Sequence, residues 1–168
     1  MREVVYFVMR NNRGAWDGTH AVTAERSEKP LSRAQYAAIA AFRYQLRRFL
    51  AFSEGAALQA GLPPQQHQAL LAVAGHPDHE PPTVGFLAEQ LLVAPQTATE
   101  LVTRMVEAGL LTKMRGTQDR RRMELALTPR AETLLAALTA AHLEELRTME
   151  PALVRVLGRL KRTGAPEE

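Results

Sequence analysis

Cysteine is absent from this chain of 168 residues, and tryptophan occurs once. The absence of cysteine excludes disulfide bonds, thiol catalysis, thiol-based redox sensing and thiolate metal sites together. No apolar run is long enough for a membrane span, and the first residues lack the ordered basic, apolar and small-residue regions of a signal peptide. We therefore expect a cytoplasmic protein without membrane association.

The composition indicates one compact unit with extensions. Hydrophobic residues make up 46% of the chain, which is enough for one sizeable core. A chain of 168 residues is too short for two ordinary domains. The formal net charge at pH 7 is +3, and the isoelectric point is near 9.7. This mild basic excess favours an acidic partner, of which nucleic acid is the commonest.

The first 31 residues differ from the rest of the chain. The short apolar run REVVYFVMR has strand-like residues, and NNRGAWDGTH after it is rich in turn formers. We expect residues 1–31 to form an N-terminal extension. It is either an arm that packs on a partner subunit or a loosely attached tail.

Two helices are predicted after this extension. Ser32 and Gln35 have the spacing of a capping box, so the first helix begins there and continues to about Ala60, before Gly61. Pro64 suits the first turn of a second helix, which ends near residue 75. We expect residues 32–62 to be an N-terminal dimerisation helix, because its apolar stripe is broader than one small core can cover.

The middle of the chain has the pattern of a helix-turn-helix. A short amphipathic helix begins at Val84, a tight break follows at residues 92–94, and Pro95 begins a second helix that Gly109 ends. Two short helices joined by so few residues must cross steeply, which is the helix-turn-helix arrangement. The second helix is expected to bury Ala98, Leu101, Val102 and Met105.

A hairpin and a long helix are predicted next. Residues 110–114 and 123–127 are predicted strands, the second with alternating apolar residues, and Thr128-Pro129 is a favourable N-cap and first turn for the C-terminal helix. Pro151 is expected to break this helix, with a last helix after it. Residues 63–128 are thus a winged helix-turn-helix region, and residues 129–168 are C-terminal dimerisation helices with a tail. The predicted fold class is mainly α, with a small β-hairpin wing and a dimerisation lobe built from both ends of the chain.

The outward face of the second helix is polar and is a candidate for reading DNA. Glutamine and arginine can pair with adenine and guanine edges, and threonine can donate or offer a methyl group to thymine. The alternative is an ordinary solvated helix face. The candidate residues are Gln96, Thr97, Thr99, Glu100, Thr103 and Arg104, with Glu107 at the end of the same face.

The hairpin tip places three consecutive arginines behind one aspartate. An arginine projected by a narrow loop is suited to the minor groove, where negative potential is concentrated. Asp119 would orient Arg121 or Arg115 by a charge-assisted hydrogen bond. The alternative is a solvated basic turn, which the neighbouring helix pair disfavours. The candidate wing residues are Asp119, Arg120, Arg121, Arg122, Arg115 and Lys113.

With these features in this order, the sequence resembles the MarR family of winged-helix transcriptional regulators over residues 62–135. The resemblance is carried by GLPPQQHQALLAV, TVGFLAEQLLVAPQTATELVTRMVEAGLL and DRRRMELALTP. It implies a homodimer that binds a pseudo-palindromic double-stranded DNA operator, acts as a repressor and is released by a small aromatic ligand. By position it puts residues 96–104 on the recognition helix, and Asp119 and Arg121 on the wing.

Three positions depart from the family's pattern. Ala94 stands where a capping serine or threonine is usual, which costs about 1 kcal/mol. Leu92 occupies a turn position where glycine is common. Glu100 replaces a frequently basic residue and would be repelled by phosphate, unless it accepts a hydrogen bond from a cytosine amino group or pairs with Arg104.

The candidate ligand site is centred on His67, with Phe49 and Phe52 as apolar walls. By the resemblance, His67 occupies a place where the family often has an aromatic residue facing the cleft between the dimer helices and the DNA-binding lobe. The alternative is a packed histidine at a helix junction. No cofactor is expected.

Two alternatives to DNA binding remain. The first is a winged helix that serves as a protein-interaction module without DNA binding, in which case the same helix face would bind a partner chain. A metal-dependent enzyme is the remote alternative, resting on His76, Asp78, His79 and Glu80. These four lie in a proline-bounded loop without a partner motif, so we interpret them as a solvated loop and expect neither a metal nor an enzyme.

Overall fold

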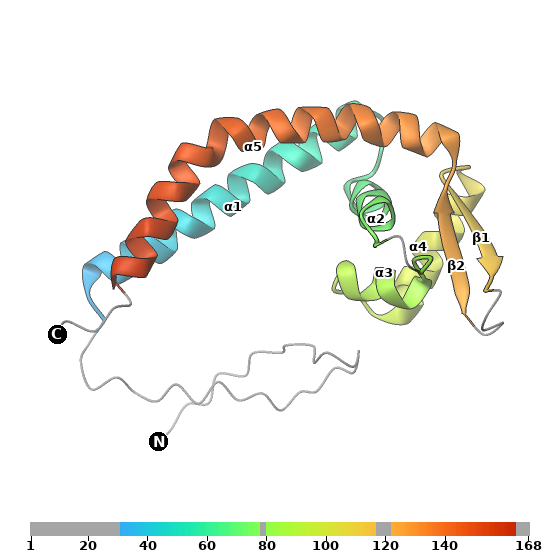
Figure 1. The fold of residues 1–168 in the computed structure, drawn as a ribbon, viewed down its shortest axis with the longest axis horizontal. Coiled ribbons are helices and arrows are strands. Elements are labelled where there is room, and N and C mark those ends of the chain that lie inside the picture. The colour runs from blue at the N-terminus through green and yellow to red at the C-terminus, as the bar shows by residue number, and fades with distance from the viewer. Residues whose placement is uncertain (1–30, 78–79, 117–121, 164–168) are drawn as a thin grey trace, which may run out of the picture.

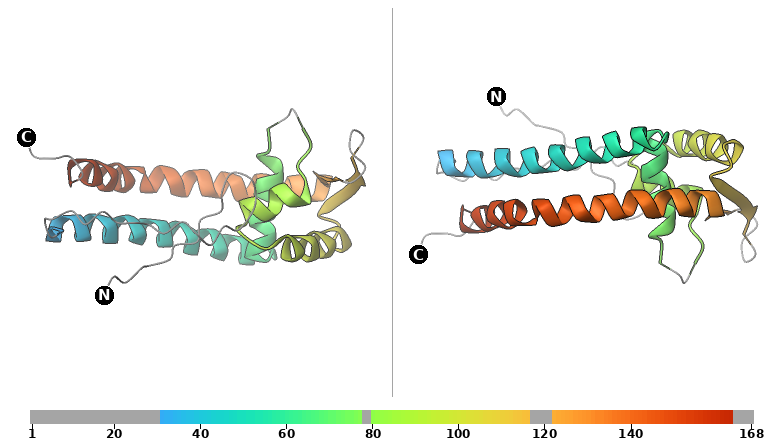
Figure 2. Two further views of the ribbon diagram at one scale, coloured as in Figure 1. Left: turned by 90° about the horizontal axis from the view of Figure 1, so that it is seen from below. Right: turned by 90° about the horizontal axis from the view of Figure 1, so that it is seen from above.

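The computed structural model describes residues 31–77, 80–116 and 122–163 (Figure 1). Two long helices, α1 and α5, lie side by side and form an arch, and a smaller lobe hangs from one end of it (Figures 1 and 2). The predicted mainly α fold with one two-stranded hairpin is confirmed. The elements are α1 (Arg33–Gln59), α2 (Pro64–Ala74), α3 (Val84–Gln90), α4 (Pro95–Glu107), β1 (Leu111–Arg115), β2 (Met123–Leu127) and α5 (Pro129–Thr163).

The helix ends follow the local sequence signals. Ser32 Oγ accepts a hydrogen bond from the backbone N–H of Gln35, and the Gln35 side chain accepts one from the Ser32 N–H at 2.7 Å. This is the predicted capping box. At the other end of α1, Gly61 has a φ of 73°, the left-handed conformation that glycine adopts without strain. Thr128 Oγ1 accepts from the N–H of Ala131 and so caps α5.

The prediction that Pro151 breaks the C-terminal helix is wrong. α5 is one helix of 35 residues with Pro151 inside it. Proline removes one backbone hydrogen bond, but Met149 and Val156 on either side are both buried, and α1 packs along α5. Tertiary packing on both sides of the proline holds the helix together. The predicted C-terminal dimerisation helices are therefore a single element.

The lobe is built around one core that also takes in the start of α5. Its residues come from α2, α3, α4, the hairpin and α5, so the helix-turn-helix and the wing form one packed unit. Within the described residues, no helix is long and apolar enough to cross a membrane. The buried core residues are Leu62, Ala69, Leu70, Val73, Leu87, Leu101, Val102, Met105, Leu110, Leu111, Leu125, Ala131, Leu135 and Leu138.

Candidate nucleic-acid interface

The turn between α3 and α4 is tight and contains a backbone conformation that is unusual for its residue. Leu92 has a φ of 54° and is 70% exposed. The backbone N–H of Val93 donates to the carbonyl of Ala88 at 3.0 Å, which closes the turn. A leucine in the left-handed region costs about 1 kcal/mol relative to glycine. The backbone conformation at Leu92 is thus one that favours glycine, which is also the residue that the family pattern favours there.

The start of α4 has no side-chain cap, as predicted. Ala94 is the N-cap and Pro95 the first helical residue, and no side chain accepts from the first-turn amides. The positive end of the helix dipole is therefore open to an anion such as a DNA phosphate. The predicted buried face of α4 is confirmed, because Ala98, Leu101, Val102 and Met105 are the four buried residues of this helix.

The outward side chains of α4 are organised by hydrogen bonds along the helix. Gln96 Nε2 donates to Glu100 Oε1 at 3.0 Å. Thr99 Oγ1 donates to the Pro95 carbonyl, and Thr103 Oγ1 donates to the Thr99 carbonyl, both at 2.9 Å. The pairing of Glu100 with Arg104, one of two options in the sequence, is replaced in the structure by the pairing with Gln96.

The hairpin has one face that changes from buried at its base to exposed toward its tip. Leu111 pairs with Leu127, Lys113 with Leu125, and Arg115 with Met123. Leu111 and Leu125 are buried, Lys113 is half-buried and Arg115 is exposed. Directly opposed residues of a hairpin lie on the same face. Lys113 and Arg115 therefore lie on the same face as the two buried leucines, but nearer the tip.

The wing is fixed to the lobe as well as to itself. The Leu125 N–H donates to the Pro82 carbonyl at 2.8 Å, and Thr83 forms an isolated bridge with Glu124. Arg122 lies 3.3 Å from Glu80 in an exposed ion pair. The segment before α3 thus acts as a third edge of the hairpin and holds its direction relative to α4.

Of the predicted wing residues, three lie in the described part of the hairpin. Lys113 and Arg115 are on β1, and Arg122 directly precedes β2. The predicted minor-groove residues Asp119, Arg120 and Arg121 lie outside the described residues.

The three residues predicted to surround a ligand gather instead around a histidine that the sequence analysis missed. The rings of Phe49, Phe52 and His67 have centroids 5.8, 5.5 and 4.8 Å from that of His142. Only 2% of His67 and 7% of His142 is exposed. The packed histidine at a helix junction is therefore the arrangement that the structure contains, between α1, α2 and α5.

The hydrogen bonds of His142 define its protonation pattern. Nδ1 lies 2.6 Å from the Leu138 carbonyl, which can only accept, so Nδ1 carries a proton. In the neutral ring Nε2 is then an acceptor, and the Ser53 hydroxyl, 2.8 Å away, donates to it. A neutral His142 thus satisfies both nitrogens and joins α1 to α5.

Stability is expected to fall at acidic pH through His67. Burial lowers the pKa of His67 from its ordinary value of 6.5, and a positive charge on His142, when that ring is protonated, acts in the same direction. Below pH 6.5 the unfolded chain therefore binds a proton that the folded protein does not, and the free energy of unfolding decreases as the pH falls toward the folded-state pKa. Urea denaturation from pH 7.5 to about 5 should show this loss for wild type and a smaller loss for His67→Gln.

A matched control is His76→Gln, a substitution at a histidine outside this cluster. It should keep the wild-type pH dependence. An identical dependence in wild type and His67→Gln would contradict the role of His67.

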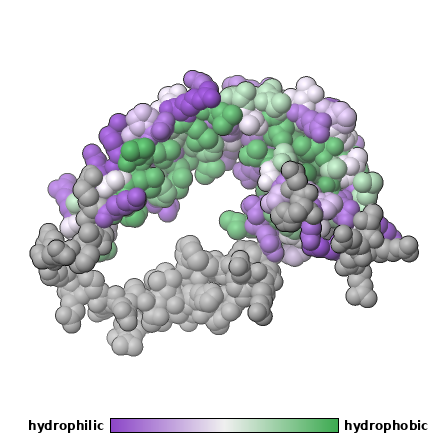
Figure 3. Space-filling model, in the orientation of Figure 1, coloured by the Kyte–Doolittle hydropathy of each residue, from purple (hydrophilic) through white to green (hydrophobic). Residues whose placement is uncertain are grey.

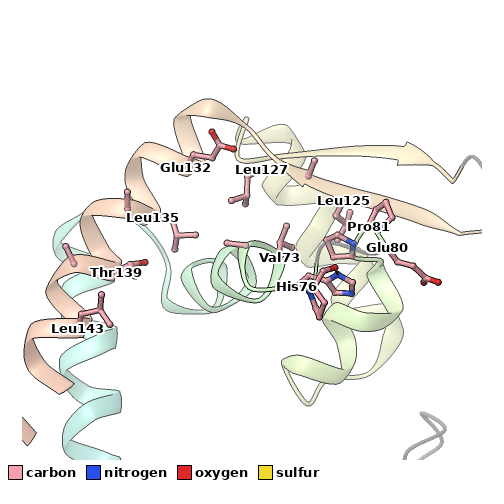
Figure 4. A pocket seen from close by; sticks show the side chains of 16 residues that line it. Val73, His76, Glu80, Pro81, Leu125, Leu127, Glu132, Leu135, Thr139 and Leu143 are labelled. Carbon is pink, nitrogen blue, oxygen red and sulfur yellow. Dashed lines mark hydrogen bonds between the residues drawn. The ribbon is translucent and has the colours of Figure 1, made fainter. Parts of the chain in front are cut away.

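A cleft of about 820 Å³ lies between α2, β2 and α5 (Figure 4). Leu127, Leu135 and Val73 converge on it from three elements, and Glu132 and Thr139 contribute polar groups from α5. Its size is within the usual range for small-molecule sites. The residues predicted for a ligand site are not among those that line it. This cleft has no signal in the sequence, because most of its wall residues are apolar and have the same pattern as core residues.

The predicted solvated loop at residues 76–80 is described only at its ends. His76 Nδ1 donates to the Pro77 carbonyl at 3.0 Å, and its ring stacks edge-on against Phe86. Glu80 is exposed and pairs with Arg122. Asp78 and His79 lie outside the described residues. Among the residues that the structure covers, no three potential metal ligands come together.

Comparison with solved structures shows which proteins share this fold. A form of MepR from Staphylococcus aureus bound to an oligodeoxyribonucleotide matches 74% of this chain and 97% of its own, with a TM-score of 0.56 and 20% identity. AbsC, a MarR family transcriptional regulator from Streptomyces coelicolor, matches 71% of this chain and 80% of its own, with a TM-score of 0.61 and 18% identity. Comparison with curated proteins finds no sequence match.

A family model extends this likeness from fold to sequence. Residues 60–122 match the model described as MarR family. This segment contains α2, α3, α4 and β1, together with the Arg120–Arg122 run. The match covers both the helix-turn-helix and the first half of the wing, so this segment of the chain is similar to the MarR family in sequence as well as in fold.

Proposed function

We propose that this protein is a DNA-binding transcription regulator that acts as a homodimeric repressor in the cytoplasm. The proposal rests mainly on the two faces of α4. Its four buried residues anchor it in the lobe, while a continuous polar face and an uncapped N-terminus are turned outward beside the wing. This arrangement suits insertion into the major groove, with the wing over the neighbouring minor groove. Support comes from the family match and from the fold shared with a regulator solved on DNA.

The contacts to DNA are assigned by position. We assign the outward side chains of α4 to base edges, with Arg104 as the basic residue among them: Gln96, Thr97, Thr99, Glu100, Thr103 and Arg104. Lys113 and Arg115 lie on the hairpin face that becomes more exposed to solvent toward the tip. We assign Arg121 to the minor groove with Asp119 as its support, and Arg120 and Arg122 to phosphates. Such charges supply most of the sequence-independent affinity.

Dimerisation is supported by apolar residues that the protomer leaves uncovered. On α1 and on α5 they recur at helical spacing along one side, and Figure 3 shows hydrophobic surface along the concave side of the arch. A second copy is the partner that would bury both stripes and place two α4 helices about one DNA turn apart. The exposed apolar residues on these stripes are Tyr36, Ile39, Leu46, Leu50, Leu143, Leu146, Val154 and Leu157.

The cleft between α2, β2 and α5 is the site that we assign to a small, mainly apolar or aromatic effector. It lies where α2 and β2 of the lobe meet the long helix α5, so a bound ligand would contact the lobe and α5 at the same time. A ligand that fits better when the lobe has moved relative to α5 shifts the population toward that arrangement. The two recognition helices would then no longer match the spacing of the half-sites, and DNA would be released.

The proposal is tested by the salt dependence of DNA binding. Full-length protein is titrated by fluorescence polarisation on DNA from upstream of its own gene, between about 50 and 200 mM salt. We expect Arg121→Ala to weaken binding on every operator and to reduce the salt slope by about one phosphate-equivalent or less. The control is Arg33→Ala, which removes the same charge at the far end of α1.

Two outcomes would contradict parts of this proposal. Unchanged affinity in Arg121→Ala would remove the wing from the mechanism. Absence of salt-dependent DNA retention in wild type would instead favour the protein-interaction module, with the α4 face binding a partner chain.

A further inference from the structure

Three side chains on the recognition face of α4 already use hydrogen-bond donors within the helix. A threonine hydroxyl has one proton, and Thr99 and Thr103 both donate theirs to backbone carbonyls of α4. Their oxygens can then only accept, and their methyl groups are the branches turned away from those carbonyls. On this stretch of the helix, threonine therefore presents apolar contacts and acceptors.

Glu100 and Gln96 strengthen this acceptor character. The Gln96 amide donates to Glu100 Oε1, which holds the carboxylate in place on the outward face one helical turn from the N-terminus of α4. Within the described residues, Gln96 is the side chain that pairs with Glu100, and the second carboxylate oxygen has no partner there. An ionised carboxylate offers acceptors only. The Glu100 carboxylate can therefore satisfy only a donor on the base that it meets, while the Gln96 amide, which fixes it, keeps one further N–H.

The major groove limits which base can supply that donor. Guanine presents two acceptors there, which would oppose the carboxylate, and thymine presents an acceptor and a methyl group. Adenine presents an amino group beside the N7 acceptor, so only half of its edge suits a carboxylate. Cytosine presents its N4 amino group without a neighbouring acceptor on the same base, and it is therefore the best match.

We propose that Glu100, positioned by Gln96, selects cytosine at one fixed position of each operator half-site. This inference rests on the proposed function, because it assumes that α4 enters the major groove. A hydrogen bond from the cytosine amino group to Glu100 would offset the repulsion between this carboxylate and the DNA phosphates. Thr99 and Thr103 provide methyl groups beside it, which suit contact with thymine methyl groups in the neighbouring base pairs.

The test is selection from DNA with randomised half-sites, followed by sequencing, with full-length wild type, Glu100→Gln, Glu100→Ala and Glu107→Gln. Wild type should enrich one cytosine position about tenfold over other bases. Glu100→Gln should shift that position to adenine, because an amide offers a donor and an acceptor that match adenine N7 and N6. Glu100→Ala should make the position nearly neutral.

Glu107→Gln is the matched control, since it removes the same charge at the far end of the same helix. It should keep the cytosine preference while raising affinity generally. Glu100 is exposed, so its substitution is not expected to disturb folding. Wild-type half-sites without a fixed cytosine, or the same half-site for wild type and both Glu100 variants, would overturn the inference while DNA binding itself stands. Failure of wild type to enrich any sequence would overturn both this inference and the proposed function.

Discussion

A protein in which Ile39 and Val154 are both replaced by glutamate is expected to be monomeric and to bind operator DNA at least about 100-fold more weakly than wild type. Ile39 is 52% exposed and Val154 is 61% exposed in the protomer. Placing a charge at each would leave it unpaired in the dimer interface, which costs several kcal/mol. A monomer has one α4 helix and loses the gain in affinity that two linked half-site contacts provide.

Sedimentation velocity gives the oligomeric state of this variant, and fluorescence polarisation gives its affinity for DNA. The control is Tyr44→Glu, because Tyr44 is 54% exposed on α1 but lies on a different side of the helix from Ile39. It should remain dimeric and bind DNA like wild type. A dimeric Ile39→Glu/Val154→Glu protein with unchanged affinity would show that these stripes are not the interface.

The second large effect is expected from Leu70→Ala, which should lower the free energy of unfolding by about 2–5 kcal/mol. Leu70 is fully buried in the core that joins the helix-turn-helix to α5. Truncating it removes apolar burial and leaves a cavity that the surrounding side chains can fill only in part. Urea denaturation at one fixed protein concentration measures the change, since the proposed dimerisation would make stability depend on concentration.

Leu71→Ala is the matched control for this prediction. It is the next residue on α2 and makes the same chemical change, but 45% of its side chain is exposed. Its expected cost is about 0.5 kcal/mol or less. Equal losses for both variants would contradict the assignment of α2 as the helix that anchors the lobe through one face.

The elements that were predicted well are those with local signals. Helix boundaries depend on short sequence signals, so they can be predicted without the tertiary structure. The signals here are the Ser32 capping box, Gly61, Pro64 and Pro95. The polar face of α4 was predicted for the same reason, because it follows from the positions of its four buried residues.

The elements that were missed depend on partners distant in sequence or on a choice between equivalent neighbours. Pro151 remains helical because α1 packs along α5. His142 is defined by its contacts with Ser53, 89 positions before it, and with rings on two other helices. Glu100 has candidate partners one turn away in both directions, and only the side-chain conformation selects Gln96.

Footprinting of full-length protein on DNA from upstream of its own gene is the most direct test of the account. A homodimeric repressor is expected to give a symmetric footprint with two major-groove contacts about one DNA turn apart, produced by one dimer. Hydroxyl-radical cleavage should also show protection of the flanking minor grooves, where the wings lie. Absence of any sequence-specific protection, or a single asymmetric contact from a monomer, would contradict it.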